Sequence, residues 1–234
     1  MSDTVNGPVE VQRHDGWAEV VLNRPERKNA ITGPLGVALS AAIEGCDADE
    51  GIRAIVLRGA DGSFCSGLDL KEFNAQPSPE WLPDFQRTWR GVHRALFDCS
   101  TPIVGALERF AINGGAALAL ACDLLVAGEG AFLQVGEVQL GMAAPYNVAW
   151  LNLRVSEVIA ARIVLLGERL YAEQLRALQL VERIVPDDAV VEEGRQLAEQ
   201  IAAYPEGVAR IKASLRSRCD DDADAWFDRV VTVR

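Results

Sequence analysis

The sequence predicts a single α/β protein. Four short apolar segments between residues 16 and 127 are bounded by turn residues, as is typical of buried strands: 16–22, 52–59, 102–107 and 124–127. Amphipathic segments lie between them, and the last third of the chain has a mainly helical pattern. No low-complexity linker divides the chain. We therefore expect a core over residues 1–186 and a helical region over residues 187–234 that does not fold independently.

The first helix is predicted after the basic turn that contains Pro25. Thr32 can cap this helix, with Pro34 in its first turn. Apolar residues then recur at helical spacing as far as Cys46, and the run 47–51 ends the helix. Residues 60–72 leave the second strand as a loop rich in glycine and small residues, a common place for a ligand.

The next segments differ in character. Pro77, Pro79 and Pro83 make residues 74–83 a surface segment that we expect to be mobile, and residues 84–99 form an amphipathic helix. Beyond residue 130 we expect an extended segment, an irregular turn, a short strand and further helices. The extended segment is 131–135, the irregular turn 136–142 and the short strand 182–185. The helices are expected at 155–166, 172–178, 189–204, 206–218 and 225–231. The acidic run 220–224 favours the start of the last helix.

A glycine-led helix, Asn113–Asp123, follows the third strand. Gly114 and Gly115 open a run of small apolar residues, so the helix is expected to be buried. A helix that begins at glycine offers free backbone N–H groups, and the helix dipole favours negative charge there. The segment can thus hold an oxyanion. The alternative is a tightly packed core helix whose glycines only permit close approach.

Composition excludes several classes of protein. The net charge of −11 argues against general nucleic-acid binding. The five cysteines form no CxxC pair, so we expect neither disulfides nor structural zinc, and we expect a reducing cytoplasm. No apolar stretch is long enough to span a bilayer, and the N-terminus has no signal pattern.

The sequence has few candidates for metal binding, nucleophilic catalysis or acid–base catalysis. His14 and His93 have no neighbour at metal-ligand spacing, and the sequence contains no HExxH, GxSxG, P-loop or GxGxxG motif. Glu137 lies in an otherwise apolar run. Burial would raise its pKa and suit it to proton transfer near neutral pH, whereas a glutamate on a surface turn would have no such role.

Spaced motifs carry a resemblance to a known family. The segment Phe64–Glu72, with Asn23-Arg24-Pro25 upstream and the glycine-led helix downstream, resembles the crotonase (enoyl-CoA hydratase/isomerase) superfamily from about residue 18 to about residue 218. The resemblance implies a spiral of ββα units, a helical C-terminal trimerisation region and an acyl-CoA thioester ligand. The partner expected is a second copy of the chain, in a homotrimer or a dimer of trimers. Family members usually carry one more helix past the position matching Phe227, which can close over the ligand.

The resemblance also assigns roles to residues. The N–H groups of Leu68 and Gly114 match the pair that polarises the thioester carbonyl, and Glu137 matches a catalytic glutamate. No metal or separate cofactor is implied, since coenzyme A is part of the substrate. The positions expected to bind substrate or CoA are Arg24, Arg27, Lys28, Ala30, Ser66, Gly67, Asp69, Lys71 and Ala117.

Ala117 helps to distinguish between the possible reactions. It stands where hydratases of the family have their first glutamate, so one of their two acids is missing. A single glutamate can still move a proton between two carbons of an enolate-stabilised allyl system. The segment 136–146 also looks closest to that of Δ3,Δ2-enoyl-CoA isomerases. An isomerase is therefore the leading hypothesis. A hydratase using Glu137 alone and a non-catalytic acyl-CoA-binding protein are the alternatives.

Overall fold

A six-stranded sheet forms the centre of the molecule. The computed structural model describes residues 7–216 and 222–231. The strand order is β1-β2-β3-β4-β6-β9, and all neighbours are parallel except the antiparallel pair β1 and β2. The strands are β1 (Val9–Arg13), β2 (Ala18–Leu22), β3 (Ile55–Gly59), β4 (Ile103–Leu107), β6 (Leu124–Gly128) and β9 (Arg183–Val185).

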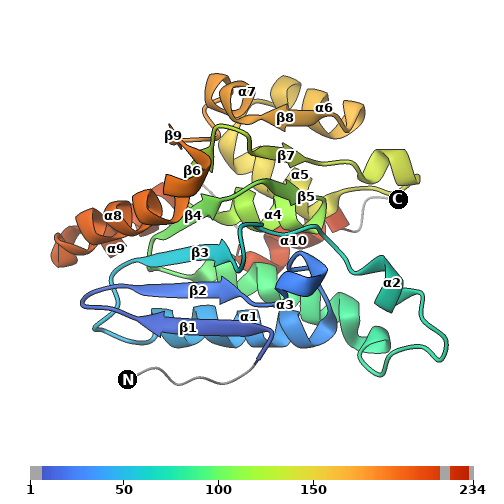
Figure 1. Cartoon of the computed structure of the whole chain (residues 1–234), viewed down its shortest axis with the longest axis horizontal. Coiled ribbons are helices and arrows are strands. Elements are labelled where there is room, and N and C mark those ends of the chain that lie inside the picture. Colours follow the sequence, from blue (N-terminus) through green and yellow to red (C-terminus); the bar gives the residue numbers. More distant parts are fainter. Residues whose placement is uncertain (1–6, 217–221, 232–234) are drawn as a thin grey trace.

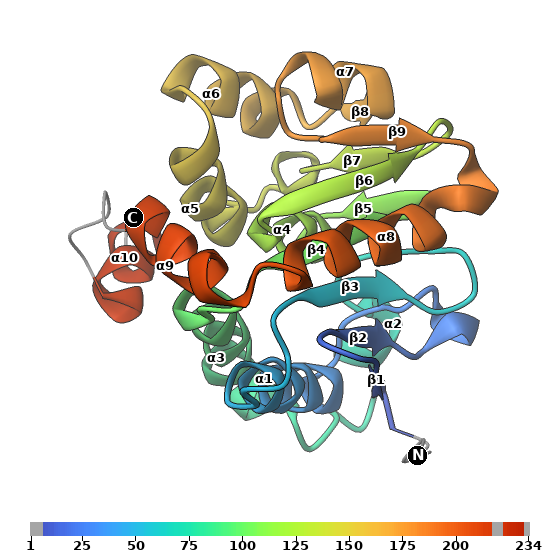
Figure 2. The ribbon, with the colours of Figure 1, turned by 90° about the vertical axis from the view of Figure 1, so that its left-hand side faces the viewer.

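Both faces of this sheet are covered, which explains why its strands read as continuous apolar runs. Successive side chains of a strand point to opposite faces. Ile55 and Leu57 of β3 thus join the larger core cluster, while Val56 joins a smaller one with Val104 of β4. The helices α1 (Gly33–Asp47) and α3 (Phe85–Asp98) lie on one side of the sheet, and α8 (Val190–Ala202) lies on the other (Figures 1 and 2).

A second, three-stranded sheet lies beside the first (Figure 1). It has the order β5-β7-β8, with β5 and β7 parallel and β8 antiparallel to β7. Its strands are β5 (Phe110–Ile112), β7 (Phe132–Gln134) and β8 (Arg169–Tyr171). The glycine-led helix α4 (Gly114–Ala121) follows β5 directly.

Further helices complete the molecule. They are α2 (Leu70–Phe73), α5 (Pro145–Arg154), α6 (Glu157–Leu166), α7 (Ala172–Ala177), α9 (Pro205–Arg216) and α10 (Ala223–Val231). Single-turn helices occupy Pro25–Arg27, Leu82–Asp84, Glu137–Leu140 and Asp187–Ala189. Helix α10 packs against α5 and α3, so the C-terminal region closes over the core (Figure 2). No helix of the described residues is long and apolar enough to cross a bilayer.

Most expected elements are confirmed. The four predicted strands are β2, β3, β4 and β6. The cap of α1 is confirmed too, because the Leu35 N–H donates to Thr32 Oγ1 over 3.4 Å. Helix α4 is buried as expected, from Gly115 to Ala121. The strands β1, β5 and β8 were not predicted; β5 and β8 have three residues each, and β1 is only half-buried.

Several expectations concern single side chains. Cys46, Cys65, Cys99 and Cys122 are free and buried, whereas Cys219 lies outside the described residues, as do Asp220 and Asp221. His93 is a core residue, completely buried, whose Nδ1 accepts a hydrogen bond from the Trp150 indole N–H over 2.9 Å. The expected mobility of residues 74–83 stays a prediction.

Candidate active site

The N-terminus of α4 presents backbone donors without acceptors. Within the described residues, the N–H of Gly114 donates to no protein group. A Cβ on Gly114 would lie 2.8 Å from Ile31 Cδ1 and 3.4 Å from Trp89 Cζ2. Apolar groups therefore pack beside this N–H and lower the local dielectric, which strengthens any hydrogen bond it makes to a ligand.

The loop after β3 presents a second donor. The Ile31 N–H donates to the Gly67 carbonyl over 2.8 Å, and the Asp69 N–H donates to the Ile31 carbonyl over 2.9 Å. In this parallel bridge the polar backbone groups of Leu68 face away from Ile31. The Leu68 N–H donates to no group of the described residues.

Two close approaches bring this loop against the start of α4. A Cβ on Gly67, whose φ is +87°, would lie 2.7 Å from the carbonyl oxygen of Ile112. A Cβ on Gly115 would lie 2.5 Å from the Cys65 carbonyl oxygen, and Cys65 pairs with Ala111 in a β-bridge. The backbones carrying the Leu68 and Gly114 N–H groups are thus packed in direct contact.

Glu137 begins the single-turn helix Glu137–Leu140 and is half-buried. Its Oε1 accepts a hydrogen bond from Asn147 Nδ2 over 2.9 Å, while its buried Oε2 has no hydrogen-bond partner among the described residues. Burial raises the pKa of Glu137 to about 7, despite hydrogen bonds from its own backbone N–H and from Asn147 that lower it. This carboxyl group can both accept and return a proton near neutral pH.

Asn113 joins the acid to the helix terminus. Its Oδ1 accepts from the Gly136 N–H and its N–H donates to the Gln134 carbonyl, both over 2.8 Å. Asn147, which is 2% exposed on α5, donates from the same Nδ2 to the Asn113 carbonyl over 3.1 Å. The sequence analysis did not identify Asn147. Its only signal is that it is an amide on a largely apolar helix.

The basic turn is largely engaged in ion pairs. Arg27 binds both carboxylate oxygens of Asp69, over 3.1 and 2.8 Å, and Arg24 reaches Asp69 over 3.3 Å and Glu72 over 3.2 Å. Asp69 is buried and also caps α2 through the Glu72 N–H. The Arg27 hydrogen bond lowers the pKa of Asp69 to about 2. The two arginines are thus balanced by two acids, and Asp69 holds them in place.

Lys28 and Lys71 differ from these arginines. Both are exposed, and neither forms an ion pair within residues 7–216 and 222–231. Ser66 lies beside Lys28, because its N–H donates to the Lys28 carbonyl over 3.1 Å, and Ala30 is buried behind the turn. The free positive charge of this region therefore comes from the lysines.

Ala117 lies one turn into α4, completely buried, and its N–H donates to the Asn113 carbonyl over 3.0 Å. Its methyl group offers no hydrogen bond, so Glu137 is the acid that this region provides. No group of three or more His, Cys, Asp or Glu side chains suited to a metal ion occurs in the described part of the chain.

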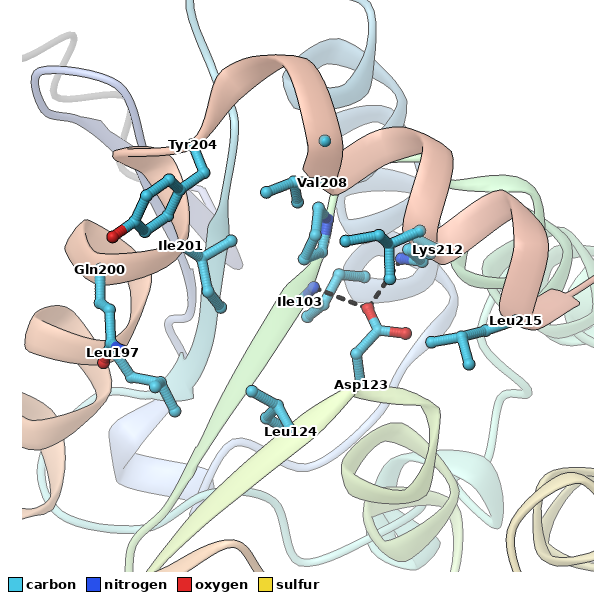
Figure 3. Close-up of a pocket in the computed structure, with 13 residues that line it drawn as sticks. Ile103, Asp123, Leu124, Leu197, Gln200, Ile201, Tyr204, Val208, Lys212 and Leu215 are labelled. Atoms are coloured by element: carbon cyan, nitrogen blue, oxygen red, sulfur yellow. Dashed lines mark hydrogen bonds and ion pairs between the residues drawn. The ribbon is translucent and has the colours of Figure 1, made fainter.

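An apolar cavity of about 500 Å³ lies elsewhere, between α8, α9 and the ends of β4 and β6 (Figure 3). At its wall, Lys212 binds Asp123 Oδ2 over 2.8 Å and the Thr101 carbonyl over 2.7 Å, so its charge is satisfied. None of the predicted site residues lines this cavity. It is therefore separate from the site around Glu137.

Comparisons with known proteins show which family the chain belongs to. The family model described as enoyl-CoA hydratase/isomerase matches residues 12–229. A mitochondrial enoyl-CoA hydratase of Pongo abelii is 32% identical over 81% of this chain and 65% of its own length. The 1,2-epoxyphenylacetyl-CoA isomerase of Escherichia coli is 29% identical over 91% of this chain and 83% of its own length.

A solved structure shows the same fold. The crystal structure of an enoyl-CoA hydratase/isomerase from Xanthobacter autotrophicus superposes with a TM-score of 0.85 at 30% identity, covering 96% of this chain and 84% of that one. The mixed α/β architecture is thus the crotonase fold, with its helical C-terminal region. The chain belongs to the enoyl-CoA hydratase/isomerase family, the crotonase superfamily, and is an enzyme of that family.

Proposed function

We propose that the protein is an enoyl-CoA isomerase that converts a 3-enoyl thioester into the 2-enoyl thioester in fatty-acid metabolism. The proposal rests on one observation: a single half-buried acid, Glu137, is linked through Asn147 to Asn113 at the start of α4. The buried Ala117 stands where hydratases of the family have another glutamate. Moving a proton between two carbons needs one base, whereas hydratases of the family use two glutamates.

The reaction follows from the groups in place. The thioester carbonyl accepts hydrogen bonds from the N–H groups of Leu68 and Gly114. The Glu137 carboxylate removes a proton from C2, and the electrons move onto the carbonyl oxygen to give a dienolate. The protonated Glu137 then donates that proton to C4, which leaves the double bond between C2 and C3. Each oxyanion donor of this kind is worth about 2.7–4 kcal/mol of transition-state stabilisation.

The surroundings support an acyl-CoA substrate. Val138, Leu140 and Met142 are exposed on the turn that carries Glu137, a suitable apolar surface for an acyl chain. The phosphates of CoA would meet Lys28 and Lys71, which have no ion-pair partner in the described residues. Arg24 and Arg27 shape the turn with Asp69, and Ala30, Ser66 and Gly67 line the CoA path.

Glu137→Gln tests the assignment. The amide keeps the size of the side chain and cannot accept a proton, so turnover of a 3-enoyl-CoA should fall by about 10²–10⁴-fold. Formation of the conjugated 2-enoyl thioester gives a direct spectroscopic readout. Glu193→Gln, a glutamate of α8 away from the site, is the control. Activity of Glu137→Gln within a few-fold of the wild type would refute the role.

A hydratase is the second candidate, because relatives named enoyl-CoA hydratase match most of the chain. Assaying hydration of a 2-enoyl-CoA beside isomerisation of the matched 3-enoyl-CoA separates the two. Tight thioester binding without turnover of either substrate would instead identify a non-catalytic acyl-CoA-binding protein.

The proposal also includes the oligomeric state of the protein and its location in the cell. Tyr204, Ile211 and Leu215 expose apolar side chains from α9 and the turn before it, which supports a homotrimer or a dimer of trimers. Light scattering coupled to size-exclusion chromatography gives the mass directly, and a monomer at micromolar concentration would contradict this assembly. The four cysteines of the described residues are all free, which supports a cytoplasmic location.

A further inference from the structure

One buried amide contacts both parts of the candidate site. Asn147 Nδ2 lies 2.9 Å from Glu137 Oε1 and 3.1 Å from the Asn113 carbonyl oxygen. The orientation of this amide is fixed by chemistry, since a carbonyl oxygen only accepts hydrogen bonds and the atom facing it must be the NH₂ group. Its two hydrogens therefore serve two different acceptors.

The second acceptor determines where Gly114 points. The Asn113 carbonyl and the Gly114 N–H belong to the same planar trans peptide group, so they point in opposite directions. A bond that holds the carbonyl therefore also sets the direction of the N–H. Asn113 has φ 52° and ψ −114°, a positive-φ backbone conformation that side-chain-bearing residues rarely adopt and that needs support from its surroundings. The bonds to Asn147, Gln134 and Gly136 supply that support, and the Ala117 N–H also donates to the Asn113 carbonyl, over 3.0 Å. Asn147 is the side chain that joins this carbonyl to Glu137.

We propose that Asn147 is a positioning residue for the reaction. Its one NH₂ group aligns the carboxylate of Glu137 and, through the Asn113 carbonyl, the N–H of Gly114. The inference rests on the proposed function, because it assumes that these two groups face the same thioester. It makes the proton-transferring group and the oxyanion donor parts of one hydrogen-bonded unit, although 24 residues separate Asn113 from Glu137 in the chain.

Few other polar groups reach this unit. The pKa of Glu137 is set by burial, its own backbone N–H and Asn147, with no contribution from a charged side chain of the described residues. The ionisable side chains on the packed elements are Tyr146 and Arg154 of α5, Glu157 and Arg162 of α6, and Asp224, Asp228 and Arg229 of α10, and none of them contributes to the pKa of Glu137. Removal of the Asn147 NH₂ group should therefore change the pKa of Glu137.

The test compares Asn147→Ala and Asn147→Asp with wild type and with Asn152→Ala, which removes an exposed amide from the same helix. The first readout is the pKa of Glu137, from the pH dependence of kcat and from carbon-13 NMR of the carboxyl group, assigned with Glu137→Gln. The second is the red shift of the absorbance of bound cinnamoyl-CoA, which reports polarisation of the thioester carbonyl and needs no turnover.

For Asn147→Ala we expect the Glu137 pKa to rise by about one unit, because a donor to the carboxylate is lost. The red shift should shrink and kcat should fall at least tenfold with little change in KM. Asn147→Asp keeps the shape, replaces the donor by an acceptor and should raise the pKa further. Asn152→Ala should match wild type in all readouts.

Opposite outcomes overturn the inference. A folded Asn147→Ala protein with an unchanged Glu137 pKa and an unchanged red shift would leave Asn147 a merely structural residue, even if kcat fell. Should this variant not fold, the same two readouts on Asn147→Asp decide. Wild type without isomerase turnover would refute the proposed function, while the NMR titration would still decide whether Asn147 controls Glu137.

Discussion

Gly115 lies so close to Cys65 that a Cβ atom there would be 2.5 Å from the Cys65 carbonyl oxygen. Real side chains do not come this close to backbone, so α4 and the loop after β3 can meet only because residue 115 is glycine. The same contact holds the Gly114 and Leu68 N–H groups on adjacent segments. The glycine therefore serves the site through close approach as well as through its position at a helix start.

Gly115→Ala should separate these segments and reduce kcat/KM by about 10²–10³-fold, the effect of losing one oxyanion donor. Overpacking should also lower the free energy of unfolding by about 1–3 kcal/mol. Gly45→Ala is the matched control. It has open space around its Cβ position on the exposed face of α1, so stability should rise by about 0.5–1 kcal/mol with activity unchanged. A folded Gly115→Ala protein with wild-type kcat/KM would contradict the role of this contact.

The pH dependence of isomerisation should follow Glu137. Burial raises its pKa to about 7, and the group must be ionised to remove the proton from C2. Activity should therefore rise about tenfold per pH unit below pH 7 and level off above it. Initial rates from pH 5 to 9 at saturating substrate measure this profile. A midpoint near 4.5, the ordinary pKa of a glutamate, would show that the carboxyl group is solvated during turnover.

Ala117→Glu should increase hydration relative to isomerisation, since it supplies the second acid with which hydratases of the family hold water. Ala117 is completely buried, so the longer side chain must displace its neighbours and should destabilise the protein by about 1–3 kcal/mol. Ala117→Gln is the control, with the same size and no ionisable group. Equal hydration by both variants would mean that the effect is steric.

Asp69→Asn should destabilise the protein most at neutral pH. The Arg27 hydrogen bond lowers the pKa of Asp69 from 3.8 to about 2, so the native state favours the ionised form. That stabilisation, about 2 kcal/mol, is complete above about pH 5 and is lost as the pH falls towards 2. Urea unfolding at pH 7 and at pH 3 should show a smaller difference between wild type and variant at the lower pH. An equal difference at both would contradict the coupling.

Replacing Lys28 and Lys71 together by alanine should raise KM for the CoA thioester several-fold, more at low salt than at high salt. The same variant should leave KM unchanged for the acyl-pantetheine thioester, which lacks the nucleotide phosphates. Arg162→Ala removes an exposed charge from α6 and serves as the control. Equal increases of KM for both thioesters would place the effect on the acyl or pantetheine part.

The sequence predicted the elements whose signals are local. Helix α1 was expected from Thr32 to Cys46 and spans Gly33–Asp47, because its cap and its apolar spacing lie within one stretch of chain. The four buried strands were identified for the same reason. Strands β5 and β8 were missed, and each is a strand through its pairing with β7, a contact between separate segments of the chain.

The same distinction between local signals and long-range contacts holds for the candidate site. The sequence by itself determined the family, through several short motifs in order along the chain, and the glycine-led helix, which is one contiguous motif. It also predicted Glu137 as the candidate acid, through the resemblance to that family. The tertiary structure alone revealed the pairing of Arg24 and Arg27 with Asp69 and the double contact of Asn147 with Glu137 and Asn113. Arg27 and Asp69 are 42 residues apart, and Asn147 and Asn113 are 34 apart. Contacts of this kind leave no periodic trace in the sequence, because they depend on how separate elements pack.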